Sequence, residues 1–194
     1  MKARCAYLGL FLVASQLLAC SSSVREQEQR YRTFYRETAQ ALTPDFELPD
    51  AALIGPFWAQ VEGRNWETRD GTGQTKAEFW TSGEFNGDAS TDYAYILAES
   101  ASGTLAVFAF VSGGEGYQAI RLVDGFNWGI WLRTREPGRY ATAAAGGAGP
   151  SSPDNVQEFV ADYQVIDFFQ PESSSSSFVW NAESQSFDRF WTSD

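Results

Sequence analysis

Side chains that carry oxygen recur at alternate positions in the segment GEFNGDASTDY, residues 83–93. Glu84, Asn86, Asp88 and Asp92 occupy the first, third, fifth and ninth positions of a calcium-loop spacing, and Ser90 would supply its backbone carbonyl at the seventh. A tight loop with this spacing can fold its oxygens around one hard cation. The sequence therefore predicts a weak Ca²⁺ site formed by these five residues.

The segment is not an EF-hand, because Tyr95 occupies the twelfth position, where that loop needs a bidentate acid. It resembles instead the strand-loop-strand calcium loop of FG-GAP and VCBS-type repeats, whose pattern DxNGDGxxDY precedes an apolar strand. Two residues depart from that pattern. Glu84 replaces the first Asp, and Ala89 replaces a Gly, at a cost of about 1 kcal/mol if its φ must be positive.

The resemblance extends over residues 76–194 through the segments LAVFAFVSGGEGYQAIRL and FVWNAESQSFDRFWTSD. It points to bacterial envelope proteins with a single such motif and carries no biochemical activity with it. The alternative interpretation of the loop is a hairpin turn at Asn86-Gly87, with Asp88 and Asp92 solvated or capping. In both interpretations the loop is structural rather than catalytic.

The N-terminal residues have the pattern of a secretory signal peptide. Lys2 and Arg4 precede an apolar run over residues 6–13, and small residues follow it. The run is shorter than the roughly 20 residues that span a bilayer, so no transmembrane helix is predicted.

The stretch LLAC that ends at Cys20 resembles the bacterial lipobox. The resemblance implies cleavage before Cys20, acylation of its thiol, and sorting to the outer membrane because Ser21 follows. We therefore expect residues 1–19 to be a signal peptide and the domain to lie in the periplasm, anchored by lipid at Cys20. An ordinary signal peptide with an accidental Cys20 is the alternative.

Composition excludes several classes of activity. The chain has 14 basic and 25 acidic residues and no His, and loss of residues 1–19 removes two basic residues, which leaves a net charge of −13. Nucleic acid is excluded as a partner because phosphate contacts need clustered cations. The lack of His removes Ser-His-Asp triads and His-based zinc sites.

The remaining enzyme hypothesis is a glycan-acting hydrolase with paired carboxylates. Its candidate acids are grouped near Trp66, at Glu62, Glu67, Asp70 and Glu78. A solvated acidic face is the simpler interpretation of this group. We assign no catalytic residue and expect a non-enzymatic binding or structural module, whose partner would be a cationic envelope protein or a glycan.

The hydrophobic pattern predicts a mainly β fold of the α+β type, with an N-terminal amphipathic helix packed on a twisted, mostly antiparallel sheet. Residues 20–45 would form a Ser tether and the helix, the latter over residues 24–42. Residues 46–194 would form one β-rich domain with a flexible loop at 141–155 and a polar break at 173–177. The candidate strands are 57–62, 76–84, 93–99, 104–111, 117–123, 129–133, 156–160, 165–169, 177–180 and 187–191.

The chain contains seven Trp residues. Most lie within apolar strand patterns, so we expect most of them to pack in the core. Trp58 and Trp66 lie in less regular sequence and are the candidates for stacking on a ligand.

Overall fold

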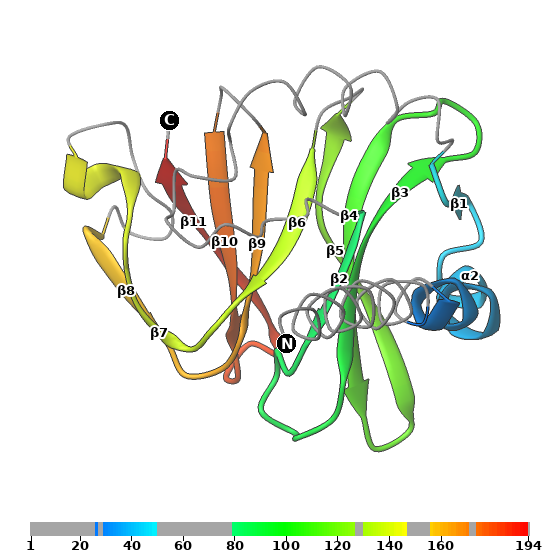
Figure 1. The fold of residues 1–194 in the computed structure, drawn as a ribbon, viewed down its shortest axis with the longest axis horizontal. Helices are drawn as coiled ribbons and strands as arrows, with labels where there is room; N and C mark the ends of the chain where they lie inside the picture. The colour runs from blue at the N-terminus through cyan, green and yellow to red at the C-terminus, as the bar shows by residue number, and fades with distance from the viewer. Residues whose placement is uncertain are drawn as a thin grey trace, which may run out of the picture. The chain divides into compact units, whose positions relative to one another are not determined.

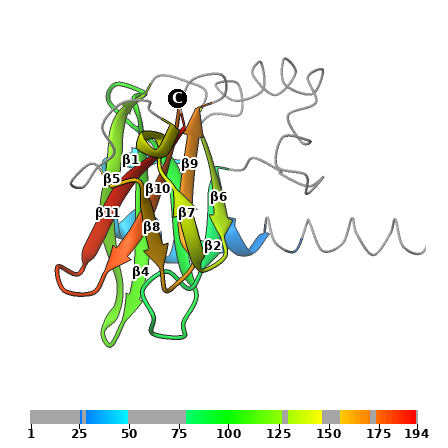
Figure 2. The same cartoon turned by 90° about the vertical axis from the view of Figure 1, so that its left-hand side faces the viewer.

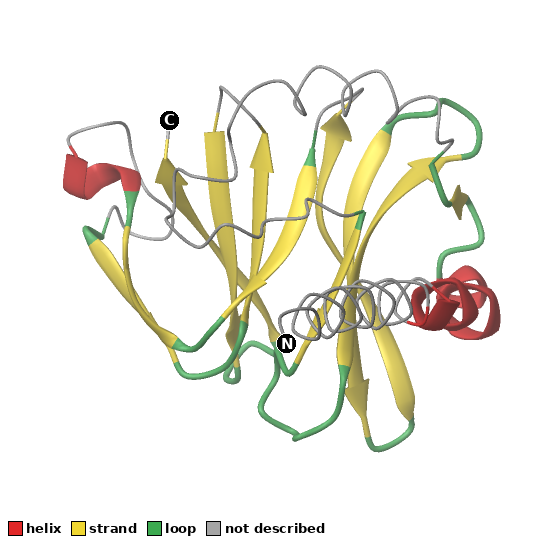
Figure 3. Cartoon of the chain, in the orientation of Figure 1, coloured by secondary structure: helices red, strands yellow, loops and turns green. Residues whose placement is uncertain are grey.

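The computed structural model describes residue 26 and residues 29–49, 79–126, 130–146, 156–170 and 174–193. The chain divides into two compact units between Ala41 and Leu42. Figure 3 shows that strands dominate the described residues, and all of their pairings are antiparallel, which confirms the mainly β class. No helix among the described residues is long and apolar enough to cross a bilayer.

The described part of the first unit is helical. Residues 29–34 are α-helical, and a π-turn, η1 (Tyr35–Ala39), follows, in which the Gln40 N–H donates to the Tyr35 carbonyl. A last turn, α2 (Gln40–Leu42), completes the helix. Pro44 follows soon after, and a proline disfavours helical geometry in the residue before it. The predicted start at residue 24 lies outside the described residues.

Three consecutive strands of the first sheet form a meander. The order of this sheet is β1-β3-β4-β5, with β2 also paired to β3. β3 is buried at seven of its eight residues, as expected for a strand covered on both faces, whereas β5 is exposed or half-buried throughout, as expected for an edge strand. The strands are β1 (Phe46–Glu47), β2 (Trp80–Gly83), β3 (Asp92–Glu99), β4 (Leu105–Gly113) and β5 (Gly116–Phe126).

The second sheet has the order β11-β10-β9-β6, and a separate two-stranded ribbon pairs β7 with β8 (Figure 1). An aromatic cluster joins the ribbon to this sheet, because Phe159 of β8 stacks on Phe190 of β11 at 4.3 Å between ring centroids. Figure 2 shows the ribbon in front of the sheet. The strands are β6 (Trp131–Arg135), β7 (Gly138–Ala141), β8 (Glu158–Ala161), β9 (Val165–Gln170), β10 (Ser174–Asn181) and β11 (Ser186–Ser193).

The two larger sheets share one hydrophobic core. Ile96 and Val107 of the first sheet pack with Leu132, Phe168 and Phe178 of the second, and all five are buried. The sheets also meet at β2 and β6, where the Thr134 hydroxyl donates to the Ser82 carbonyl at 2.9 Å. Burial of this apolar area, at about 25 cal/mol per Å², is the main stabilising contribution in the described part of the domain.

One local prediction was wrong. Of the polar break predicted at 173–177, residues 174–177 instead begin β10, because the serine hydroxyls find partners in the sheet: Ser177 donates to Asp167, and Ser176 accepts from Arg189. The loop at 141–155 begins with the end of β7 and a 3₁₀-helix, η3 (Ala143–Gly146), and its remainder lies outside the described residues. The predicted strand 57–62 also lies outside them.

Candidate functional site

The predicted calcium-loop segment connects β2 to β3, and its last acid is fully buried. Asp92 has no exposed surface. Its Oδ2 accepts the backbone N–H of Phe85 at 2.7 Å, and its Oδ1 accepts the backbone N–H of Ser112, also at 2.7 Å. The carboxylate therefore ties the start of the loop to the end of β4.

Ser112 is the point at which two candidate ligands meet. Its hydroxyl lies 2.7 Å from Asp92 Oδ1 and 2.9 Å from Asp88 Oδ2, and its carbonyl accepts the Asn86 amide N–H at 2.8 Å. Because a hydroxyl has only one proton, Ser112 can donate to one of the two carboxylates at a time. The acids at the fifth and ninth positions of the motif thus share one serine hydroxyl.

The other loop oxygens accept N–H groups of the loop itself. Glu84 Oε1 accepts from Gly87 N, Asn86 Oδ1 from Asp88 N at 3.2 Å, and Asp88 Oδ1 from Ser90 N at 2.8 Å. Such side-chain-to-backbone bonds two or three residues apart define turns. Asp88 thus caps the turn through Ser90 N, and the buried Asp92 caps the start of the loop through Phe85 N.

Two loop residues adopt the left-handed conformation. Gly87 has φ +85°, and a Cβ at this position would lie 2.3 Å from Tyr163 Cζ, so both backbone and space require glycine. Ala89 has φ +63°. The departure from the motif at Ala89 therefore carries the expected cost of about 1 kcal/mol.

The pKa values of Asp88 and Asp92, the two acids at Ser112, shift in opposite directions. Burial raises the pKa of Asp92 above its ordinary value of 3.8, although hydrogen bonds from Ser112 and Phe85 oppose the rise. The backbone N–H of Ser90 lowers the pKa of Asp88, which is fully exposed. Asp88 is thus the acid of the pair that holds its negative charge at the lower pH, and it faces solvent.

The donor set of the loop fits a calcium ion in its chemistry. Carboxylate, amide and backbone carbonyl oxygens are the ligands that Ca²⁺ takes in protein loops. Within the described ranges, no three acidic or cysteine side chains are gathered closely enough to form a ready metal centre. Calcium would accordingly have to replace the hydrogen bonds that Glu84, Asn86 and Asp88 now make within the loop.

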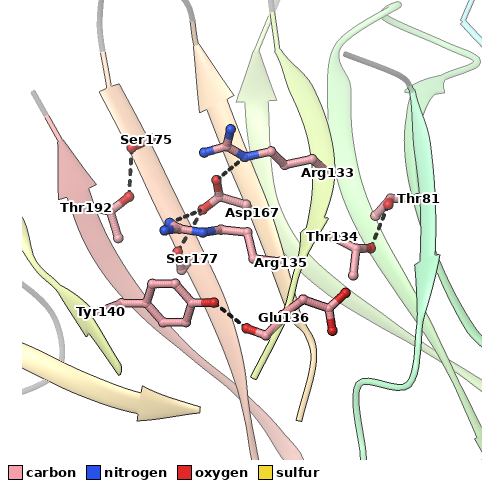
Figure 4. A network of polar contacts seen from close by, with 10 residues as sticks. All are labelled: Thr81, Arg133, Thr134, Arg135, Glu136, Tyr140, Asp167, Ser175, Ser177 and Thr192. Carbon is pink, nitrogen blue, oxygen red and sulfur yellow. Dashed lines mark hydrogen bonds and ion pairs between the residues drawn. The ribbon is translucent and has the colours of Figure 1, made fainter. Parts of the chain in front are cut away.

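A second polar cluster, on the second sheet, was missed by the sequence analysis (Figure 4). Asp167 of β9 is fully buried, and its Oδ2 lies 2.7 Å from Arg133 Nε, while its Oδ1 accepts the Ser177 hydroxyl at 2.7 Å. Arg135 Nη1 lies 3.7 Å from the same carboxylate. Arg133 and Ser177 are the direct cross-strand partners of Asp167, so strand register builds the cluster.

Most of the other predicted site residues lie outside the part of the chain that the structure describes. Cys20, Trp58, Trp66 and the acids Glu62, Glu67, Asp70 and Glu78 lie outside the described residues. Among the Trp residues expected in the core, Trp131 is buried, whereas Trp80, Trp180 and Trp191 are half-buried, and Trp128 lies outside the described residues. Two residues that hydrogen-bond to the loop gave no signal in the sequence: Ser112, and Gln164, whose Oε1 accepts the Glu84 N–H at 2.9 Å. The fold brings both to the loop from distant parts of the sequence.

A scan of protein-family models, a search of curated proteins and a search of solved structures each found no match to this chain.

Proposed function

We propose that this chain is an envelope lipoprotein whose β domain is a binding or structural module, stabilised by weak calcium binding at the Glu84–Asp92 loop. The observation that supports this most directly is the convergence of Asp88 and Asp92 on Ser112. One acid anchors the loop from inside the domain, and the other faces solvent. A cationic envelope protein or a glycan is the proposed partner class, in keeping with the net charge of −13.

The proposed calcium ligands are Glu84, Asn86, Asp88, the Ser90 carbonyl and Asp92. These ligands fall short of the upper end of calcium coordination, so water would complete the shell. The affinity is then expected in the range of about 10⁻⁴ to 10⁻³ M that is typical of extracellular modules. The ion would stiffen the β2–β3 connection and would perform no chemistry.

Calcium should raise the melting temperature of the purified full-length protein in detergent. At ten times its dissociation constant the ion would stabilise the fold by about 1.4 kcal/mol, and hence by a few degrees. Asp88→Ala should abolish this increase without unfolding the calcium-free protein, because the Asp88 side chain is exposed. Asp124→Ala, which removes an exposed acid from β5, should retain it.

Melting curves recorded with calcium, with magnesium and with sodium at equal ionic strength separate ion binding from screening. Magnesium should have little effect, because it demands closer octahedral geometry. An equal response of the wild type and Asp88→Ala to calcium, or no response of either, would show that the segment is a turn only.

The proposed anchor is the lipid on Cys20, and its removal has an all-or-none effect. The wild type should incorporate a radioactive fatty acid and sediment with outer membranes, whereas Cys20→Ser should do neither. A multiply acylated cysteine holds a protein stably at a bilayer, because each buried methylene contributes about 0.8 kcal/mol. Equal membrane partitioning by the two forms would refute the anchor.

We also propose that the N-terminal helix packs on the β domain through its apolar side. Tyr31, Phe34 and Tyr35 recur at helical spacing. Tyr95 and Phe110 in turn form a T-shaped pair on the face of the first sheet opposite the shared core, with ring centroids 5.7 Å apart. A chain that begins at Leu42 and melts at the temperature of the longer chain would contradict this packing.

A further inference from the structure

Arg189 lies on the core-facing side of β11, the strand at one edge of the second sheet (Figure 1). Phe187 and Trp191 are two residues away on either side, so all three side chains share one face of the strand. Phe187 packs against the shared hydrophobic core, which identifies that face. The guanidinium carbon of Arg189 lies over the rings of Phe168 and Phe178, at 5.9 and 5.8 Å from their centroids. A half-buried cation is therefore held at the rim of the core.

No acid among the described residues neutralises this cation. The Arg189 Nε donates to the Ser176 hydroxyl oxygen at 3.1 Å, and the other contacts of the guanidinium are with aromatic rings. Asp188, its neighbour in sequence, lies on the opposite face of the strand and accepts the Asn181 amide N–H at 3.0 Å. Burial lowers the pKa of Arg189, and no charged group opposes that shift. Arginine nevertheless stays charged, so the site holds one positive charge without a counterion.

The terminal nitrogen atoms of Arg189 are accessible to a ligand. Nη1 and Nη2 have no hydrogen-bond acceptor in the part of the chain that the structure describes, and neither is among the fully buried polar atoms there that lack a partner. Both atoms therefore keep contact with solvent. The Trp191 ring, whose centroid is 4.3 Å from the guanidinium carbon, holds the group in place.

Aromatic side chains provide apolar surface on both sides of Arg189. Trp180 of β10 is the cross-strand partner of Phe187, and their rings form a T-shaped pair with centroids 5.2 Å apart. Trp191 lies on the other side of Arg189, and all three aromatic side chains are half-buried. An uncompensated cation thus lies between rings that still expose part of their surface.

We propose that this arrangement binds a small organic acid, with its carboxylate on Arg189 and its apolar body on Phe187 and Trp191. The two Nη groups can donate in parallel to both oxygens of one carboxylate. A monoanion matches the single charge, whereas a phosphate or sulfate dianion would be desolvated beside aromatic rings with only one cation to offset that cost. The site shares no residue with the calcium loop and does not depend on it.

Equilibrium dialysis of labelled hexanoate and benzoate against the full-length protein in detergent, at neutral pH and with detergent alone as the blank, tests the proposal. The acid that binds more tightly identifies the apolar body as alkyl or aromatic. It should bind about tenfold more tightly than its neutral amide, as expected for one charge-assisted contact, and more tightly than acetate, which lacks the apolar body. Binding of neither acid, or an affinity no higher than that of the amide or of acetate, would overturn the proposal.

Arg189→Gln should weaken binding of the preferred acid by about tenfold, to the affinity of the amide. Arg121→Gln, which removes an exposed arginine from β5, should leave the affinity unchanged. Circular dichroism without ligand checks that Arg189→Gln is folded, and if it is not, Arg189→Lys keeps the charge without the fork and should weaken binding several-fold. Equal affinities of the wild type and the folded Arg189 variant would overturn the proposal, and the comparison of acid with amide in the wild type requires neither variant.

Discussion

Replacement of Arg133 by methionine should destabilise the β domain by about 3–5 kcal/mol, the cost of leaving one partner of a buried ion pair uncompensated. Asp167 has no exposed surface, so water cannot replace the lost guanidinium. Arg135, at 3.7 Å, is too distant to donate a hydrogen bond in its place. Urea unfolding of the full-length protein, followed by tryptophan fluorescence, measures the change.

Two further variants test whether the loss comes from the uncompensated charge. Arg135→Met should cost less than about 1 kcal/mol, because the Arg135 guanidinium is partly exposed to solvent and lies 3.7 Å from Asp167, too far for a hydrogen bond. The double variant Arg133→Met/Asp167→Leu should recover much of the lost stability, since an apolar pair can replace a buried ion pair. If Arg133→Met and Arg135→Met are equally destabilised, the assigned roles of the two arginines are wrong.

Strand patterns in the sequence predicted most of the fold that the structure describes. Apolar-aromatic runs bounded by Gly and Asp gave β3, β4 and β5 to within a few residues, because their alternation and their turns are local properties. β7 (Gly138–Ala141) was missed because its composition continues into the Gly/Ala-rich segment. Its only described strand partner is β8, which lies far along the sequence, so the local pattern gives no sign of the pairing.

The serine run in β10 shows where the secondary-structure propensity of residues gives a wrong prediction. Serine favours turns because its hydroxyl competes for backbone hydrogen bonds. Ser176 and Ser177 are fully buried in the strand, since one accepts from Arg189 and the other donates to Asp167. A tertiary partner thus overrides the local preference, and a single sequence contains no sign of that partner.

The candidate site likewise has features that the local sequence predicted and features that depend on pairing between distant strands. The spacing of acids located the loop, and the left-handed Ala89 followed from its departure from the motif. The burial of Asp92 did not follow, because its donor Ser112 is 20 residues away and reaches it only through the pairing of β3 with β4. The Arg133–Asp167 pair, 34 residues apart, depends entirely on strand register.

Asp92→Ala should destabilise the domain by about 2–6 kcal/mol, because it leaves two backbone N–H groups without their acceptor at a cost of about 1–3 kcal/mol each, whereas the Ser112 hydroxyl can still donate to Asp88. The two backbone donors belong to Phe85 and Ser112. Asp92→Asn preserves the shape but turns an N–H₂ group toward one of the two backbone donors, so it should also be destabilised. Asp88→Asn, at an exposed position, should change stability by less than about 0.5 kcal/mol. Comparable losses for Asp88→Asn and Asp92→Asn would contradict the different roles of the two acids.

The penalty of Asp92→Asn should also depend on pH, measured by urea unfolding without calcium. Burial raises the pKa of Asp92 in the folded state above 3.8, so its titration contributes stability that is fully present below 3.8 and is lost as pH rises through the folded-state pKa. The variant lacks this titration. The difference in unfolding free energy between wild type and Asp92→Asn should therefore be larger near the ordinary pKa of aspartate than at neutral pH. The pKa of Asp88 is lowered in the folded state, so its titration contributes stability that is lost as pH falls. Asp88 titrates in both proteins, and its contribution therefore cancels to a first approximation in the difference between them. A penalty that shrinks on acidification would show that hydrogen bonds from Ser112 and Phe85, rather than burial, govern the Asp92 carboxylate.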